Sequence, residues 1–291
     1  MAFDTEHENK PPVIIIGAAR SGTNILRDCL TGLPGLGTWP CDEINAIWRH
    51  GNRAHPTDEL TPEMASPAVK GFIRKRFSRI RQVYKLNRVV EKTCANSLRV
   101  LFVQRIFPEA QYIFLIRDGR DAVLSAVRRW TASFDLLYTL RKARFVPLSD
   151  IPFYFLGYVR NRIHQVYSKE KRLSSWGPRF QGLQEALQGR GLAEVCAMQW
   201  VQCVQKAEHD FQHIHPKRIY RLYYEDFVSS PKAHLRGMCR FLGLPEQHVE
   251  GVSKLSSIST GSIGRWKSAP MGEIDMIQPL IQETLQRHGY F

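Results

Sequence analysis

The chain has 291 residues, of which 43% are hydrophobic and 11% aromatic, so it can bury a sizeable core and is not a disordered or collagen-like chain. The 41 Lys and Arg residues oppose 27 Asp and Glu, and the resulting formal net charge of +14 predicts an anionic partner without saying which kind. No run approaches the ~18 apolar residues of a membrane span, the polar start predicts no signal peptide, and 6 scattered Cys residues without a C-x-x-C pair predict reduced thiols and a cytoplasmic location.

The chain opens with a predicted strand, a glycine-bounded loop and a helix. Residues 1–11 are polar, and we expect a solvated tail. Residues 13–16 (VIII) are β-branched, as in a buried parallel strand, and Gly17 ends the run. Residues 24–30 have helical spacing and stop before the next glycines. Residues 32–68 follow without a clear period, and connections of that length in a compact domain are usually functional.

The next stretch alternates between predicted helices and strands. Residues 70–88 hold eight Lys and Arg residues and no acid, which predicts a basic helix that leads to a strand at residues 88–92. An amphipathic helix follows at residues 98–106, residues 111–116 form the next strand, and residues 117–130 turn into another helix. This alternation is typical of a parallel sheet with helices on both faces.

The second half begins with a basic, aromatic stretch of weaker periodicity, residues 131–195, where we expect a helical insertion or a lid over the acceptor. Residues 192–213 predict an amphipathic helix, residues 218–223 a strand, and residues 231–242 a helix with Pro at its start and Gly just past its end. No repeat or linker is apparent. We therefore predict that residues 1–291 form one α/β domain, with a central parallel sheet flanked by helices, a P-loop-like phosphate-binding loop and a helical insertion.

The loop at residues 17–24, Gly-Ala-Ala-Arg-Ser-Gly-Thr-Asn, lies between the first predicted strand and helix. Backbone N–H groups at such a helix N-terminus can surround a phosphate, and the helix dipole favours its charge. Arg20 adds a fixed positive charge with forked donors. Thr23 stands where a nucleoside-triphosphate P-loop requires Lys, which argues against a kinase-like enzyme that binds Mg-triphosphate. An ordinary strand–helix turn would need fewer polar residues.

A second candidate anion site lies at Arg117 and Ser125. Arg117 ends a strand, and Ser125 follows eight residues later in the next helix, so both can reach the side of the sheet that carries the first loop. Each residue alone has an ordinary structural interpretation, as a surface ion pair for Arg117 and as a hydroxyl bonded to a helix carbonyl for Ser125. Together, beside a phosphate loop, they predict a ligand with two separated phosphates.

Five segments together resemble the sulfotransferase family, whose members use 3′-phosphoadenosine 5′-phosphosulfate (PAPS). In chain order the segments are GAARSGTN at 17–24, EKTCAN at 91–96, FLIRDGRDAVLS at 114–125, YYEDF…P…FLGLP at 223–245 and GRWK at 264–267. Their order and spacing match over roughly residues 12–130 and 195–270. The Arg-Ser-Gly-Thr of the first loop is similar to tyrosylprotein and Golgi-type carbohydrate sulfotransferases, whereas cytosolic small-molecule sulfotransferases have Lys in that loop and a His base.

The resemblance implies which residues hold the nucleotide. The first loop would hold the 5′-phosphosulfate, the second anion site the 3′-phosphate, and a segment near the C-terminal end would close over both. One tyrosine of a strand-ending pair would approach the nucleotide, with Tyr223 as the candidate and Tyr224 left open. The implied PAPS-binding residues are Arg20, Ser21, Gly22, Thr23, Asn24, Arg117, Ser125, Tyr223, Arg265, Trp266 and Lys267.

Transfer of a sulfuryl group makes a separate demand on the site. A hydroxyl must attack sulfur in line while the phosphate leaves, and positioned cations stabilise the charge that grows on the oxygens. Arg20 and Lys92 are the candidates, since the family places a catalytic lysine just after a strand, where Lys92 stands. We expect no metal, because no triphosphate needs neutralising.

The acceptor hydroxyl must also lose a proton, and a carboxylate within reach can take it. Residues 41–45 (CDEIN) resemble the segment that carries a catalytic Glu in tyrosylprotein sulfotransferases, although that pattern has two adjacent Glu and this one has Asp then Glu. Glu43 is the first candidate for the base and Asp42 the second. His50 and His55 follow this loop and are candidates for contact with an acceptor.

The leading hypothesis is therefore a PAPS-dependent sulfotransferase whose acceptor is a saccharide or polysaccharide, with a protein tyrosine as the alternative. The basic residues 70–88 and the basic, aromatic residues 131–181 would suit an anionic acceptor. A non-catalytic protein that binds nucleic acid or another polyanion would also explain the charge. We expect no nucleic-acid partner, however, because no helix-turn-helix, zinc-finger or RNP pattern is found, and such a protein gives Glu43 no role.

Overall fold

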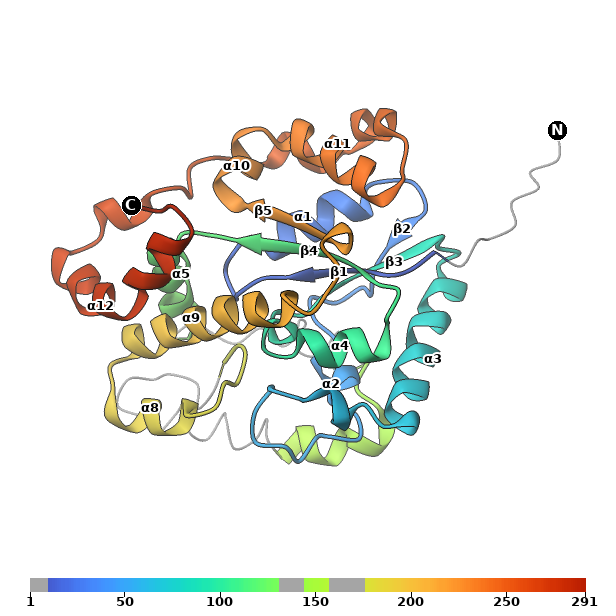
Figure 1. The fold of residues 1–291 in the computed structure, drawn as a ribbon, viewed down its shortest axis with the longest axis horizontal. Coiled ribbons are helices and arrows are strands. Elements are labelled where there is room, and N and C mark those ends of the chain that lie inside the picture. The colour runs from blue at the N-terminus through green and yellow to red at the C-terminus, as the bar shows by residue number, and fades with distance from the viewer. Residues whose placement is uncertain (1–9, 131–143, 157–175) are drawn as a thin grey trace.

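The computed structural model describes residues 10–130, 144–156 and 176–291. Within them, parallel strands form one sheet in the order β2-β3-β1-β4-β5 (Figure 1). The strands are β1 (Val13–Ile16), β2 (Leu36–Gly37), β3 (Arg88–Lys92), β4 (Gln111–Ile116) and β5 (Ile219–Tyr223). The predicted α/β class with a parallel sheet is confirmed. The first nine residues of the predicted tail and two stretches of the predicted insertion lie outside the described residues.

Helices cover both faces of this sheet (Figure 1). On one face lie α1 (Thr23–Thr31), α10 (Tyr224–Ser229) and α11 (Pro231–Leu242). On the other lie α2 (Asn45–Trp48), α3 (Pro67–Val83), α4 (Val100–Ile106), α5 (Gly119–Trp130), α8 (Leu183–Gly189), α9 (Leu192–Phe211) and α12 (Met271–Arg287). Each face of the sheet therefore has its own apolar core, as a parallel sheet requires.

The first strand shows why the sequence has no polar residue there. Successive side chains of a strand point to opposite faces. Ile14 and Ile16 enter the core under α4, α5 and α9, whereas Val13 and Ile15 enter the core under α1 and α11. All four side chains are fully buried. A continuous β-branched run, rather than an alternating pattern, is what a central strand covered on both faces needs.

The predicted basic helix is α3, which is shorter than its charge pattern. Ser66 caps it by accepting a hydrogen bond from the Val69 N–H, and Pro67 occupies the first turn. One stripe of the helix is apolar and buried, formed by Val69, Ile73, Phe77 and Ile80. The helix ends at Val83, and Lys85, with φ at 50°, turns the chain back toward β3. The basic residues beyond Val83 therefore belong to this turn and to β3.

Sequence periodicity does not reveal β2. The strand has two residues, and Leu36 and Gly37 pair with Arg88 and Val89 at the edge of the sheet. A two-residue strand has no measurable period, so only the neighbouring strand defines it. In the predicted insertion, the described parts at 151–156 and α8 are helical, as expected.

Candidate active site

The predicted phosphate loop connects β1 to α1 through a strained turn. Arg20 and Gly22 both have left-handed backbone conformations, with φ at 69° and 86°. At Gly22 a Cβ atom would lie 2.4 Å from the Tyr224 ring, so both the conformation and the space require glycine. A positive φ is uncommon for a residue such as Arg20 and typically occurs where a site holds the backbone in place.

The first turn of α1 has no side-chain cap, which suits the binding of an anion. Its N-cap residue, Gly22, offers no side chain to the first-turn N–H groups, and this first turn contains no acid. Nearby, the Ser21 hydroxyl, the Asn24 amide oxygen and the Arg117 Nε are buried without a hydrogen-bond partner among the described residues. Because buried polar atoms in native proteins nearly always have partners, these atoms point to a ligand with several polar groups.

The two predicted anion sites are adjacent. Arg20 Nε donates a hydrogen bond to Ser125 Oγ at 3.0 Å, and Arg117 Nη1 donates to the Arg20 carbonyl oxygen at 2.9 Å. Arg117 thus connects the end of β4 to the loop after β1, and α5 brings Ser125 to the same place. The arrangement satisfies the geometric condition of the two-phosphate hypothesis.

Like charges gather around Arg20. Burial lowers the pKa of its guanidinium, and the neighbouring charges of Arg129, Arg117 and Arg128 lower that pKa further. Arginine side chains carry a permanent positive charge in proteins, so the proximity of these four favours a bound anion. The sequence analysis missed Arg128 and Arg129. Their spacing of three and four residues from Ser125, which places them on the same side of α5, was the available signal.

The structure changes the tyrosine assignment. Tyr224, not Tyr223, stands at the phosphate loop, where its ring lies 4.4 Å from the Arg117 guanidinium carbon and its hydroxyl 2.6 Å from Ser262 Oγ. Tyr223 packs into the core of the opposite face, with its hydroxyl 3.5 Å from His288 Nδ1. Consecutive residues at the end of a strand point to opposite faces, so only one member of the pair can reach the loop.

The segment at 261–267 docks on the second anion site. Arg117 Nη2 donates to the Ser262 carbonyl oxygen at 2.7 Å. The Asp121 carboxylate accepts the backbone N–H groups of Gly264 at 2.7 Å and Trp266 at 2.9 Å. Two of the predicted closing residues, Arg265 and Lys267, are exposed, and Arg265 Nε donates to the Gly261 carbonyl oxygen. The segment therefore lies beside Arg117, and its closing over a nucleotide stays a prediction.

A lysine–carboxylate pair lies at the end of β3. Lys92 Nζ and the Cys94 backbone N–H both donate to Glu43 Oε1, at 3.1 and 3.2 Å. Burial alone would lower the pKa of Lys92, but the charge of Glu43 and its hydrogen bond outweigh burial and raise this pKa. Thr23 Oγ1, in the first turn of α1, lies 3.6 Å from Cys94 Sγ. The pair is thus connected to the phosphate loop.

Asp42 has a different environment from its neighbour. Its backbone carbonyl accepts a hydrogen bond from Arg27 Nη1 at 3.2 Å, and its Oδ1 lies 3.5 Å from the same atom. Arg27 belongs to α1, outside the phosphate loop. Of the two candidate bases, Glu43 is therefore the one placed against Lys92.

Buried polar residues hold the loop that carries Glu43. The Glu91 carboxylate accepts hydrogen bonds from Thr93 Oγ1 at 2.5 Å and Asn96 Nδ2 at 3.0 Å, and Thr93 Oγ1 accepts one from the Ile44 N–H. Complete burial raises the pKa of Glu91 to about 7. Glu91 and Thr93 therefore hold the backbone at Ile44, next to Glu43, through a chain of two hydrogen bonds. The sequence did not indicate this role.

The two histidines considered for acceptor contact have structural partners. His50 Nδ1 lies 2.9 Å from Asp150 Oδ2, and its ring stacks on Phe72 with 3.8 Å between centroids. His55 Nδ1 lies 3.1 Å from the Thr57 carbonyl oxygen. His50 therefore ties the described start of the insertion to the loop after Glu43.

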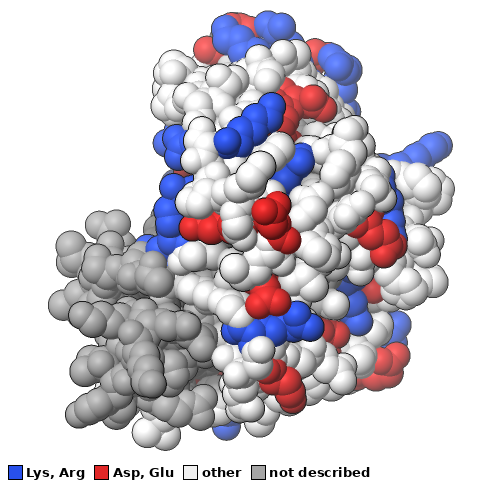
Figure 2. Space-filling view, turned by 90° about the vertical axis from the view of Figure 1, so that its left-hand side faces the viewer, with Lys and Arg blue, Asp and Glu red and all other residues white. Residues whose placement is uncertain are grey.

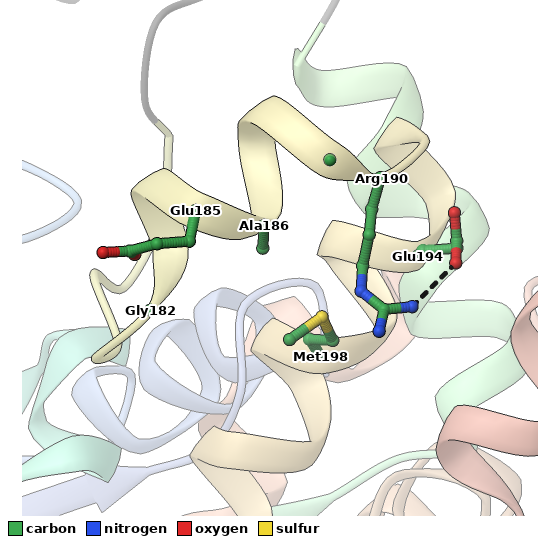
Figure 3. Close-up of a pocket in the computed structure, with 7 residues that line it drawn as sticks. Gly182, Glu185, Ala186, Arg190, Glu194 and Met198 are labelled. Atoms are coloured by element: carbon green, nitrogen blue, oxygen red, sulfur yellow. Dashed lines mark hydrogen bonds and ion pairs between the residues drawn. The ribbon is translucent and has the colours of Figure 1, made fainter.

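Other surface features lie outside this site. An open hollow between α8 and α9 is lined by Glu185, Arg190, Glu194 and Met198 among others, and Arg190 pairs with Glu194 at 3.0 Å (Figure 3). On the face shown in Figure 2, Lys and Arg are interspersed with Asp and Glu rather than gathered into one basic patch.

Within the described ranges, no helix has the length and apolarity to cross a membrane, and no group of three or more His, Cys, Asp or Glu side chains is placed to hold a metal ion. All six cysteines lie in the described part, and none forms a disulfide.

Comparisons with known proteins point to one family. The model of the sulfotransferase family matches residues 11–146 and 154–248. Protein-tyrosine sulfotransferase 1 of Rattus norvegicus is 27% identical over 151 residues, which are 45% of this chain and 38% of that protein, and the Danio rerio protein of the same name is 27% identical over 145 residues, covering 45% and 39%. The match thus spans well under half the length of these relatives.

A solved structure shows the same fold over nearly the whole chain. The sulfotransferase domain from the curacin biosynthetic pathway is 17% identical, with a TM-score of 0.51, and the superposition covers 94% of this chain and 97% of that one. With most of its length matched by the family model, the chain belongs to the sulfotransferase family of enzymes.

Proposed function

We propose that this protein transfers the sulfuryl group of PAPS to the hydroxyl of a protein tyrosine. One observation carries the proposal: Arg20, Ser125 and Arg117 converge beside a loop whose helix N-terminus is also next to Lys92 and Glu43. The site thus combines places for two phosphates with a cation and a carboxylate. The relatives named for protein-tyrosine sulfation favour tyrosine over the saccharide that we expected from the sequence.

The residues present fit a nucleotide with phosphates at both ends. The N–H groups at the start of α1 and the Ser21 hydroxyl would hold the 5′-phosphosulfate. Arg117 and Ser125, with the charge of Arg129 nearby, would hold the 3′-phosphate. Tyr224, packed against the loop and under Arg117, would shape the space between them. PAPS supplies the activated sulfuryl group.

Glu43 and Lys92 suit the chemical step. Glu43 would accept the proton of the acceptor hydroxyl as its oxygen attacks sulfur. The S–O bond to the phosphate breaks in line, and its electron pair stays on the phosphate oxygen. Lys92 and Arg20 would stabilise the charge that develops there. A buried, protonated lysine is effective in this role because the surrounding low dielectric strengthens its interaction with an anion.

Ligand binding tests the nucleotide part of the proposal. We expect 3′,5′-adenosine bisphosphate to raise the melting temperature of the protein far more than Mg-ATP does, since Thr23 replaces the lysine of a triphosphate loop. A larger shift with Mg-ATP would contradict the proposal.

A transfer assay with labelled PAPS tests the acceptor. Three substrates are compared: a tyrosine-containing peptide, the same peptide with phenylalanine in place of tyrosine, and a polysaccharide. We expect label only on the tyrosine peptide. Label on the polysaccharide alone would restore the saccharide hypothesis and reject the tyrosine one.

A further inference from the structure

The residue before Asp121 connects two distant parts of the chain. Arg120 is a charged residue with only 8% of its surface exposed. Its guanidinium carbon lies 3.8 Å from the centroid of the Trp266 ring and 5.5 Å from that of the Phe291 ring. The cation thus contacts an aromatic ring of the 261–267 segment and one that follows α12, and such contacts are strongest where water is excluded.

The guanidinium is held in one orientation. Arg120 Nε donates to Asp118 Oδ1 at 2.9 Å, and Nη2 donates to Asp118 Oδ2 at 2.7 Å, which makes a bidentate pair. Nη2 also donates to the Tyr290 carbonyl oxygen at 2.8 Å. The flat, forked shape of arginine is needed for this combination, and a lysine ammonium cannot reproduce it.

A half-buried glutamate fixes the partners of Arg120. Glu225, in the first turn of α10, accepts the Asp118 backbone N–H on Oε1 at 3.1 Å and the Tyr290 hydroxyl on Oε2 at 2.8 Å. One carboxylate therefore joins the end of β4 to the residues after α12. Glu225 directly follows Tyr224, the tyrosine at the phosphate loop.

Arg120 and Asp121 act on the same segment in different ways. Asp121 binds the backbone N–H groups of Gly264 and Trp266, whereas Arg120 covers the indole ring of Trp266. The backbone bonds fix the position of residues 264–266, and the ring contact fixes how the segment lies against α5. Arg265 and Lys267 flank Trp266 and are exposed, so we expect the placement of Trp266 to set where these two side chains lie.

We propose that Arg120, clasped by Asp118 and Tyr290, is a positioning residue that seats the 261–267 segment over the nucleotide, so that nucleotide affinity depends on residues 290 and 291. The identity of the nucleotide rests on the proposed function, but the seating of the segment does not. The interaction acts on binding rather than on the sulfuryl transfer, because Arg120 binds Asp118, Tyr290 and Trp266, whereas Glu43 and Lys92 pair with each other at the end of β3.

The first arm of the test measures affinity and turnover. Arg120→Lys keeps the charge but loses the fork and the flat face, and we expect about a tenfold higher Kd for 3′,5′-adenosine bisphosphate. KM for PAPS should rise in parallel, with kcat within about twofold of the parent value. Tyr290→Phe removes only the hydroxyl that Glu225 holds, and we expect about a threefold effect. Arg236→Lys, at an exposed pair with Glu250, is the matched control and should change neither constant.

The second arm needs no nucleotide. In the native protein, brief trypsin treatment followed by mass spectrometry measures cleavage after Arg265 and Lys267. We expect Arg120→Lys to speed this cleavage several-fold relative to cleavage at the exposed Arg236, while the melting temperature stays close to that of the parent. Phe291→Ala, which changes a 64% exposed side chain, should have the same effect in weaker form even if Arg120→Lys fails to fold.

The two arms separate the possible failures. If the parent protein does not bind the bisphosphate, the proposed function fails, and the trypsin arm still decides whether Arg120 seats the segment. If the parent binds it and both constants and the cleavage rate are unchanged in all three variants, Arg120 does not position the segment and the inference is overturned.

Discussion

Charge is arranged differently on the two sides of the proposed catalytic pair, Glu43 and Lys92. On the proposed nucleotide side, burial and the nearby like charges of Arg129 and Arg117 lower the pKa of Arg20, and buried polar atoms of Ser21 and Asn24 lack partners among the described residues. On the proposed acceptor side, formed by the loop after Glu43 and the chain around residues 150 and 179, the buried carboxylates of Asp58 and Asp150 are paired with arginines.

Asp58 is the centre of the ion pairs on this side. Burial tends to raise the pKa of its carboxyl, but Arg99, Arg179 and Arg49 outweigh burial and hold that pKa below its usual range. Arg49 Nη1 lies 2.9 Å from Asp58 Oδ1, and the Arg179 backbone N–H donates to Oδ2 at 2.8 Å. The ion pairs of Asp58 hold loops together, whereas we propose that the charges around Arg20 bind an anion. This contrast predicts that mutations on the acceptor side lower the stability of the protein, whereas mutations on the nucleotide side lower its affinity for the nucleotide.

The largest expected effect is on the chemical step. Glu43→Gln keeps the shape of the side chain but cannot accept the proton, and we expect kcat to fall by ~10²–10⁴ with little change in bisphosphate affinity. The matched control is Asp42→Asn, whose carboxylate faces Arg27, and it should keep most of its activity. Steady-state kinetics with labelled PAPS measures both. Normal turnover in Glu43→Gln would remove Glu43 from the mechanism.

On the acceptor side the largest effect is on stability. Asp58→Ala leaves the buried cations of Arg49 and Arg99 without their counter-charge, and we expect a loss of about 3–5 kcal/mol in the free energy of unfolding. Urea denaturation measures it. Glu109→Gln, in a half-exposed pair with Arg74, should cost less than about 1 kcal/mol. Equal costs for the two variants would mean that the Asp58 cluster does not hold the loops.

On the nucleotide side the effect falls on affinity. Arg117→Ala should raise the Kd of 3′,5′-adenosine bisphosphate about 10- to 100-fold, since one or two charged hydrogen bonds are lost. Calorimetric titration gives the constant, and the exposed Arg105→Ala on α4 serves as the control. An unchanged Kd in Arg117→Ala would separate Arg117 from the nucleotide and end the two-phosphate interpretation.

The smallest effect is a pH dependence of the free energy of unfolding, caused by Glu91, which lies between the two sides. Its pKa is about 7 in the folded protein against an ordinary 4.5, so between these values the folded chain keeps a proton that the unfolded chain releases. The free energy of unfolding should therefore fall by about 2 kcal/mol as pH rises from 5 to 7, and level off above about pH 8. Glu91→Gln should flatten this part of the curve. An identical slope in the variant would assign the dependence to other groups.

The sequence alone predicted the elements that carry strong local patterns. The β-branched run of β1, the stretch before Arg117 and the amphipathic helix α9 were each apparent from residue type and period. The phosphate loop was recognisable because glycines, Arg20 and polar residues follow a buried strand directly. The predicted membership of the sulfotransferase family is confirmed by the match to the family model.

What the sequence did not reveal depends on tertiary contacts. The choice of Tyr224 over Tyr223 follows from which face each side chain takes at the end of β5. The partners of Arg120 come from residues 118, 266 and 290, which no local pattern connects. The roles of Glu43, Lys92 and the nucleotide-binding residues, and the cytoplasmic location, stay predictions.

A crystal structure of the protein with 3′,5′-adenosine bisphosphate tests the central claim most directly. We expect the 5′-phosphate to accept hydrogen bonds from the N–H groups at the start of α1, and the 3′-phosphate to contact Arg117 and Ser125. A nucleotide bound in that crystal away from both groups would contradict the proposed site.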